Sequence, residues 1–438
     1  MTPEYSPLVT IIIPCYNYGK YVNASINSLL NSTFQDIEII VVDDGSTDQE
    51  TIEILDQLNR SKTQLIRQSN QGLHAVRNNA IPKARGKYII SLDPGDELHP
   101  TFMEKAFWIL ETYPEIGFVS SGLQAVGTED WKHIPPAYNF YKQLFHNNVC
   151  GHAMFRKQCW YDVGGYKKMH VMGYEDWDFW ISAGEKGWLG YIIPEILMYY
   201  LRVGHSMVHN AIEHHDLLVK QIKEFHPNLY HPKKLAELKT KWSQFHDLAP
   251  NLKDPSLIED LNSYIVKSIP KHKNRILFIL PWIKEKALEP EVIDFIKKLD
   301  KQDTELTIVT TMGIKNSEFE HFNKITTDIF QMTSYFPHFY RDNNFFKQLL
   351  FKLITSRGID TIYINNSYEG FQELYSIKKH FPYIPIKNLY PWLDNNSSWD
   401  YVRVSIEKDK YIDEHIVTKQ IKEILINVIG DKSKLITK

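Results

Sequence analysis

Three continuous apolar runs, each followed by polar side chains, constrain the fold of this chain most. They span residues 9–14, 37–42 and 88–92, and amphipathic helical patterns separate them. Unbroken apolar strands that alternate with helices are typical of a mostly parallel sheet that helices cover on both faces. We therefore predict an α/β fold for this part of the chain.

The polar side chains that follow the three runs form a candidate ligand site. Ligands of parallel α/β sheets bind beyond the carboxyl ends of the strands. Good turn sequences are the competing interpretation, because Asp, Gly, Ser and Pro favour turns. An aromatic ring at such a position can stack on a base or simply pack. The residues concerned are Tyr16, Asn17, Asp43, Asp44, Asp93 and Asp96.

A fourth segment, Glu175-Asp176, places two acids among large rings that include Trp177. A carboxylate among apolar rings is poorly solvated, so its basicity rises, which suits a general base. The alternative is that both acids open a helix, where the helix dipole favours negative charge.

Paired acids such as Asp93 and Asp96 can hold Mn²⁺ or Mg²⁺, which prefer oxygen ligands. His205 is the candidate for a third metal ligand, although a single His in a loop is more often not a ligand.

Composition narrows the class of protein. With 438 residues, 43% of them hydrophobic and 24% charged, the chain suits two soluble domains. A net charge of -3 gives no general attraction to nucleic acid. Three scattered cysteines argue against a disulfide framework. No signal peptide or membrane-spanning run is recognisable, so we expect a cytoplasmic protein, with peripheral contact at the inner face of the membrane and homo-oligomers left open.

The patterns predict a first domain over residues 1–215, a helical connecting region over 216–270, and a smaller Rossmann-like α/β domain over 271–438. The turn after the first strand of that last domain lacks the glycines that let a backbone approach a phosphate. We expect it not to be independently catalytic. Two roles are left open for this domain: binding of the acceptor, a partner or another copy of the chain, or stabilisation of the chain alone.

In this order and spacing, the four segments resemble the family 2 glycosyltransferases with the GT-A fold, over about residues 7–210. The resemblance implies a nucleotide-sugar-binding domain that transfers sugar with inversion, with Asp176 as catalytic base. It implies an acceptor side at Gly165, Glu175 and Trp177. It implies donor-binding positions at Tyr16, Asp43, Asp44, Arg77, Asn78 and Asp93.

One departure from the family pattern affects the metal site. Family members often carry Asp-x-Asp-Asp after the third strand, and here Gly95 replaces the middle acid. A Mn²⁺ or Mg²⁺ ion on Asp93, Asp96 and His205 remains the expectation. The C-terminal part resembles, more weakly, the N-terminal half of a GT-B glycosyltransferase.

The leading hypothesis is an inverting glycosyltransferase that moves a sugar from a UDP- or dTDP-sugar to a hydroxyl of a saccharide or glycoconjugate. Surface polysaccharide or glycoprotein glycan synthesis is the expected setting. The alternative is a non-catalytic scaffold that binds a nucleotide sugar or a glycan. A nucleotidyltransferase is disfavoured, because it would need a glycine-rich basic loop after the first strand.

Overall fold

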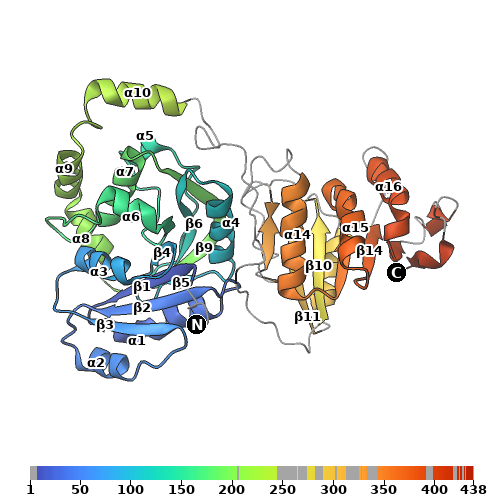
Figure 1. Cartoon of the computed structure of the whole chain (residues 1–438), viewed down its shortest axis with the longest axis horizontal. Coiled ribbons are helices and arrows are strands. Elements are labelled where there is room, and N and C mark those ends of the chain that lie inside the picture. The colour runs from blue at the N-terminus through green and yellow to red at the C-terminus, as the bar shows by residue number, and fades with distance from the viewer. Residues whose placement is uncertain are drawn as a thin grey trace, which may run out of the picture. The chain divides into compact units, whose positions relative to one another are not determined.

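The computed structural model divides into two compact units, with the division around residues 258–267. Figure 1 shows both units. The structure describes residues 7–204, 207–243, 264, 274–281, 290–300, 303–311, 325–326, 328–332, 343–390, 398–417, 422–423, 425–426, 429 and 431–437.

A nine-stranded mixed sheet forms the centre of the first unit, with the order β3-β2-β1-β4-β8-β6-β9-β5 and β7 paired to β6. The pairs β1–β2, β2–β3, β1–β4 and β6–β9 are parallel, and the pairs of β8, β5 and β7 are antiparallel. The strands are β1 (Val9–Cys15), β2 (Ile37–Asp43), β3 (Thr63–Arg67), β4 (Tyr88–Ser91), β5 (Glu97–Leu98), β6 (Ile116–Gly127), β7 (Lys132–His133), β8 (Met154–Arg156) and β9 (Leu189–Arg202).

Burial explains why the strand sequences are continuously apolar. Every residue of β1, β2 and β4 is buried, because helices cover both faces of this part of the sheet. The helices are α1 (Gly19–Leu30), α2 (Gln49–Asp56), α3 (Leu73–Ala80), η1 (Ile81–Lys83), α4 (Phe102–Thr112), α5 (Phe140–Gln143), α6 (Lys157–Val163), α7 (Glu175–Glu185), α8 (Met207–Glu213), α9 (His215–Phe225) and α10 (Pro232–Ser243).

A second, seven-stranded sheet forms the centre of the C-terminal unit, in the order β12-β11-β10-β13-β14-β15-β16. All of its recorded pairs are parallel. Its strands are β10 (Asn274–Leu280), β11 (Thr304–Thr310), β12 (Ile329–Gln331), β13 (Thr361–Ile364), β14 (Ile386–Tyr390), β15 (Glu414–Val417) and β16 (Leu435–Thr437). Its helices are α11 (Pro290–Asp300), α14 (Asn343–Arg357), α15 (Tyr368–His380), α16 (Ser398–Glu407), η4 (Asp409–Tyr411) and η5 (Lys432–Lys434). The prediction of an α/β chain with two sheets is confirmed.

The predicted boundaries of the three regions, at residues 215 and 270, stay predictions. Helices α9 and α10 belong to the first compact unit. Tyr264 also belongs to this unit, where its ring stacks on Phe34 and its hydroxyl donates to Glu104 Oε1 at 2.9 Å. Across the part of the chain that the structure describes, no helix is both long enough and apolar enough to cross a lipid bilayer.

Candidate active site

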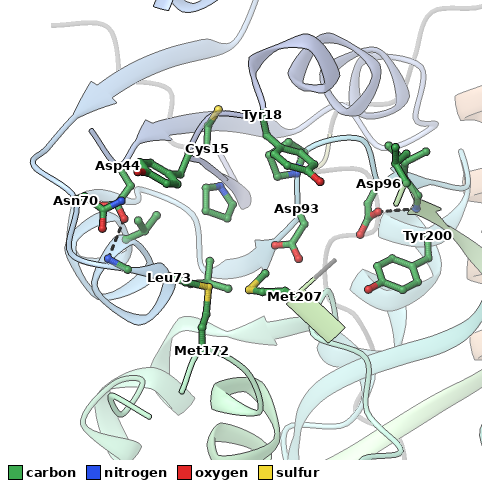
Figure 2. Close-up of a pocket in the computed structure, with 17 residues that line it drawn as sticks. Cys15, Tyr18, Asp44, Asn70, Leu73, Asp93, Asp96, Met172, Tyr200 and Met207 are labelled. Atoms are coloured by element: carbon green, nitrogen blue, oxygen red, sulfur yellow. Dashed lines mark hydrogen bonds between the residues drawn. The ribbon is translucent and has the colours of Figure 1, made fainter. Parts of the chain in front are cut away.

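A pocket of about 470 Å³ lies at the carboxyl ends of β1, β2 and β4 (Figure 2). Its volume is in the range of small-molecule sites. Its lining of apolar groups with a few acids is also typical of such sites. Four of the predicted site residues line it, Tyr16, Asp44, Asp93 and Asp96, and they come from three different strand ends. Parallel pairing brings them together, because β1 lies between β2 and β4 in the sheet.

The end of β1 gives the pocket two exposed rings. Tyr16 is 47% exposed and Tyr18 is 40% exposed, and both line the pocket. Between them Asn17 has a positive φ of 54°, and its Oδ1 accepts hydrogen bonds from the backbone N–H groups of Thr47 and Asp48 at 2.8 and 2.9 Å. These hydrogen bonds tie the loops after β1 and β2 together beside the two rings.

Asp43, the last residue of β2, and Asp44, which follows it, are buried and already accept hydrogen bonds from the protein. Asp43 Oδ1 accepts from the Ser46 N–H at 2.9 Å, as in a turn. The Asp44 carboxylate accepts from the backbone N–H groups of Gln71 and Gly72 at 3.0 and 2.8 Å, and from Gln68 Nε2 at 2.7 Å. Asp44 thus shapes the segment 68–72 at the pocket wall as well as lining the pocket.

His152 forms a buried pair with Asp96. The His152 Nδ1 lies 2.9 Å from the Ser91 carbonyl oxygen, which can only accept, so Nδ1 must carry a proton. The other nitrogen, Nε2, contacts Asp96 Oδ2. Burial raises the pKa of Asp96. Burial alone would lower the pKa of His152, but the Asp96 carboxylate outweighs it and raises that pKa to about 9.

Asp93, Asp96 and His152 together are suited to a divalent cation. One ligand atom from each lies within 4.8 Å of the others. Asp93 Oδ1 is buried and has no hydrogen-bond partner among the described residues, although an Arg77 nitrogen lies 3.9 Å away. A histidine whose other ring N–H is held by a carbonyl is the usual arrangement of a metal ligand. The two oxygens and one nitrogen suit Mn²⁺ or Mg²⁺.

The glycine that replaces the middle acid of the family pattern has a structural reason. Gly95 has a positive φ of 93°, which side-chain-bearing residues rarely adopt. A Cβ atom there would lie 2.3 Å from Leu201 Cδ2, so an acid does not fit without movement. His152 offers the third ligand atom instead.

Arg77 of α3 is buried and contacts both β4 and the first residue of α7. Its Nη1 lies 3.4 Å from Glu175 Oε1, and its Nε donates to Ser91 Oγ at 2.9 Å. Burial alone would lower the pKa of Arg77, but Glu175, Tyr166 and the nearby aspartates raise it. Burial raises the pKa of Glu175, against the lowering effect of Arg77. A buried charge needs such partners, so this pair fixes the start of α7 relative to β4.

Asp176, the predicted base, lies in the first turn of α7 and does not line the pocket of Figure 2. Its Oδ2 accepts a hydrogen bond from Asn147 Nδ2 at 3.0 Å. Burial raises the pKa of Asp176, and Arg77 partly offsets this effect. A carboxylate with raised basicity suits proton abstraction.

The pKa of the Cys150 thiol responds to Asp176 and to two acids of the pocket, Asp93 and Asp96. Burial raises the pKa of Cys150 to about 12, with smaller contributions from the negative charges of Asp96, Asp176 and Asp93. The charges of these three carboxylates therefore all affect the same thiol. Asp176 also lies beside Gly151, where a Cβ atom would be 3.3 Å from its Oδ2.

Asn78 holds the glycine-containing segment on the predicted acceptor side. Its Oδ1 accepts from the Tyr166 N–H at 2.8 Å and from Trp160 Nε1 at 3.0 Å, and its Nδ2 donates to the Tyr166 carbonyl at 2.8 Å. Gly165 lies against this amide. Trp177 is buried, and its Nε1 donates to the Gln143 carbonyl at 2.7 Å.

Apart from Asp176, in the first turn of α7, the predicted residues that the structure describes fall into three groups. Tyr16, Asp44, Asp93 and Asp96 line the pocket. Arg77 and Glu175 link β4 to α7 behind it, and Asp43, Asn78, Gly165 and Trp177 hold the surrounding loops and core. His205 lies outside the described residues. Sequence reasoning missed His152, whose only local signal is a polar residue shortly before a short apolar strand, and it missed Tyr18, Asn70, Met172, Tyr200 and Met207 in the pocket wall.

Comparison with known proteins gives related sequences for the first unit. Chondroitin synthase from Escherichia coli is 31% identical over 188 residues, which cover 41% of this chain and 27% of that protein. Hyaluronan synthase from Pasteurella multocida is 29% identical over 188 residues, which cover 41% of this chain and 19% of that protein. The chain therefore spans less than a third of the length of both synthases.

Among solved structures, Staphylococcus aureus TarS (residues 1–349) in complex with UDP-GlcNAc is similar with a TM-score of 0.44 and 17% identity. The match covers 54% of this chain and 71% of that chain. The model of the glycosyl transferase family 2 matches residues 10–171. Residues 10–171 of this chain therefore form a glycosyl transferase family 2 domain.

Proposed function

We propose that the N-terminal domain transfers a sugar from a UDP- or dTDP-sugar to a hydroxyl of a saccharide or glycoconjugate, with inversion at the anomeric carbon. The expected setting is the synthesis of a surface polysaccharide or a glycoprotein glycan. The observation that carries this proposal is the convergence of Asp44, Asp93 and Asp96, from the ends of three strands, on one pocket.

For the donor, we assign direct contact to Tyr16 and Asp93. The exposed ring of Tyr16 offers a face on which a nucleobase can stack. The partly exposed Asp93 faces the pocket and can accept hydrogen bonds from sugar or ribose hydroxyls. Asp43 and Asp44 shape the loops at the wall, and Arg77 and Asn78 hold the elements behind it.

For the cofactor, we assign Asp93, Asp96 and His152 as the ligands of Mn²⁺ or Mg²⁺. When bound, such an ion supplies Lewis-acid stabilisation of the negative charge that gathers on a leaving diphosphate. The pair of Asp96 and His152 is buried and held in place by Ser91 O and the Leu201 N–H, so little reorganisation is needed.

For the chemistry, Asp176 takes the proton from the acceptor hydroxyl. The acceptor oxygen then bonds to the anomeric carbon from the face opposite the diphosphate, the bond between that carbon and the diphosphate oxygen breaks, and the nucleoside diphosphate leaves. One displacement inverts the configuration, so an α-linked donor gives a β-linked product. The raised pKa of Asp176 and its hydrogen bond to Asn147 suit this role.

The test is a panel of nucleotide sugars with and without Mn²⁺, read by thermal shift and by release of nucleoside diphosphate. A bound donor raises the melting temperature by mass action. We expect a UDP- or dTDP-sugar to bind and to be turned over, and Asp93→Asn to lose both responses. Asp130→Asn, a change at an exposed aspartate on the same domain, is the matched control. Binding without nucleotide release with every acceptor tried would contradict transfer.

A further inference from the structure

A second, smaller cavity of about 210 Å³ adjoins the pocket of Figure 2. The two share Gly72, Leu73 and Met172 in their linings. The second cavity lies between the segment 71–74, at the start of α3, and the segment 168–175, which leads into α7. It therefore lies next to the donor pocket on the side of the predicted base.

Three basic side chains lie in the lining of this second cavity. Lys168 and His170 are exposed and His74 is partly exposed, and all three line it. The only acid of the lining is Glu175, whose charge is offset by Arg77 at 3.4 Å. Among the described residues no carboxylate forms an ion pair with Lys168. The cavity therefore presents an unneutralised positive charge toward any ligand.

Lys168 supplies most of this charge near pH 7. Burial lowers the pKa of His74, and the positive charges of Lys168 and Arg77 lower it further, against a smaller opposing effect of Asp44. His74 is therefore neutral near pH 7 and can act as a hydrogen-bond donor or acceptor. The backbone of the basic segment is fixed, because Gln221 accepts from the His170 N–H at 2.8 Å and donates to the Lys168 carbonyl at 3.2 Å.

We propose that this second cavity is an acceptor subsite for an anionic substituent, a carboxylate or a phosphate carried by the acceptor saccharide, with Lys168 as its principal contact. The inference rests on the proposed function, because the acceptor is defined by transfer from the pocket of Figure 2. An anion held between Lys168 and His74 would sit beside Glu175, the neighbour of Asp176 in the chain. Holding the acceptor by its charge would position the hydroxyl for the base.

The experiment compares three matched acceptors, p-nitrophenyl β-glucoside, p-nitrophenyl β-glucuronide and p-nitrophenyl β-glucoside 6-phosphate, with the donor identified in the panel. The enzymes are wild type, Lys168→Gln, Lys168→Arg and the control Lys239→Gln, an exposed lysine on α10. A charge-assisted hydrogen bond predicts that Lys168→Gln raises KM for an anionic acceptor about tenfold or more. The KM for the glucoside should not change, and Lys168→Arg should retain most of the preference.

The pattern of KM values decides the outcome. A larger effect on the glucuronide identifies a carboxylate, and a larger effect on the 6-phosphate identifies a phosphate. Equal KM changes for charged and neutral acceptors would overturn the proposal. So would a rise in KM for the donor in Lys168→Gln, because the cavity would then serve the donor diphosphate.

A binding measurement separates this proposal from the proposed function. Saturation-transfer NMR with the same three glycosides on wild type and Lys168→Gln needs no turnover. If the protein releases no nucleotide from any donor but binds an anionic glycoside through Lys168, the proposed function fails and the anionic subsite stands. If nucleotide release occurs but wild type does not prefer anionic glycosides in binding or KM, only the subsite fails.

Discussion

Replacing Asp176 by Asn should abolish most of the transferase activity without weakening the fold. The amide keeps the shape of the carboxylate but cannot accept a proton, so the general base is lost. A positioned general base typically contributes about 10²–10⁴-fold, which corresponds to about 3–5 kcal/mol of transition-state stabilisation. We expect kcat to fall by this factor while the affinity for the donor stays within about twofold, because Asp176 does not line the donor pocket.

The stability of this variant follows from the direction of the pKa shift. Burial raises the pKa of Asp176 in the folded protein, so the fold favours the protonated form. The stability that this form contributes is present at low pH and is lost as pH rises through the folded-state pKa. Near pH 7 the carboxylate therefore opposes folding, and a neutral amide removes that cost. Asn147 keeps an oxygen acceptor, so the free energy of unfolding should be unchanged or higher.

The assay combines nucleotide release, donor affinity by calorimetry and urea denaturation on wild type, Asp176→Asn and the control Asp130→Asn. Asp176→Asn should lose activity while its free energy of unfolding is unchanged or higher. Asp130→Asn should keep both its activity and its free energy of unfolding. An Asp176→Asn enzyme as active as wild type would refute the assigned base. A variant that loses activity together with several kcal/mol of stability would show that Asp176 acts through the structure instead.

Three further changes test neighbouring parts of the site. Gly165→Ala should lower the free energy of unfolding by about 2–4 kcal/mol, because φ is 93° and a Cβ atom would lie 2.7 Å from Asn78 Oδ1; urea denaturation with no change would contradict this. His152→Ala should weaken Mn²⁺ binding at least about tenfold by thermal shift, with His133→Ala as the exposed control; equal Mn²⁺ responses in both would remove His152 from the ligand set. Below the pKa of Asp176, kcat/KM should fall tenfold per pH unit. Burial predicts that this pKa lies above 3.8, the ordinary value of an Asp side chain. A pH profile that gives an apparent pKa at or below 3.8 would contradict the effect of burial.

The strands that position the site could be predicted because their sequences carry a strong signal. The runs at 9–14, 37–42 and 88–92 match the fully buried β1, β2 and β4, with differences of one residue at their ends. The sheet order then places the strand ends together, so Asp44, Asp93 and Asp96 could be assigned to one pocket.

The rest depends on contacts between segments that are distant in the sequence. His152 reaches Asp96 across 56 positions because the three-residue strand β8 pairs antiparallel with β4, and so short a strand has little sequence signal. Arg77 meets Glu175 across 98 positions. Asp43 accepts a hydrogen bond within the turn that its sequence suggests, from the Ser46 N–H. Asp44 instead accepts one from the distant Gly72 N–H, which the turn sequence does not indicate.

The anomeric configuration of the first product tests the central claim most directly. With an α-linked donor identified in the panel, proton NMR at early times should show a β-linked product, as one displacement assisted by Asp176 requires. An α-linked product would contradict this account, because retention cannot arise from a single attack opposite the leaving diphosphate.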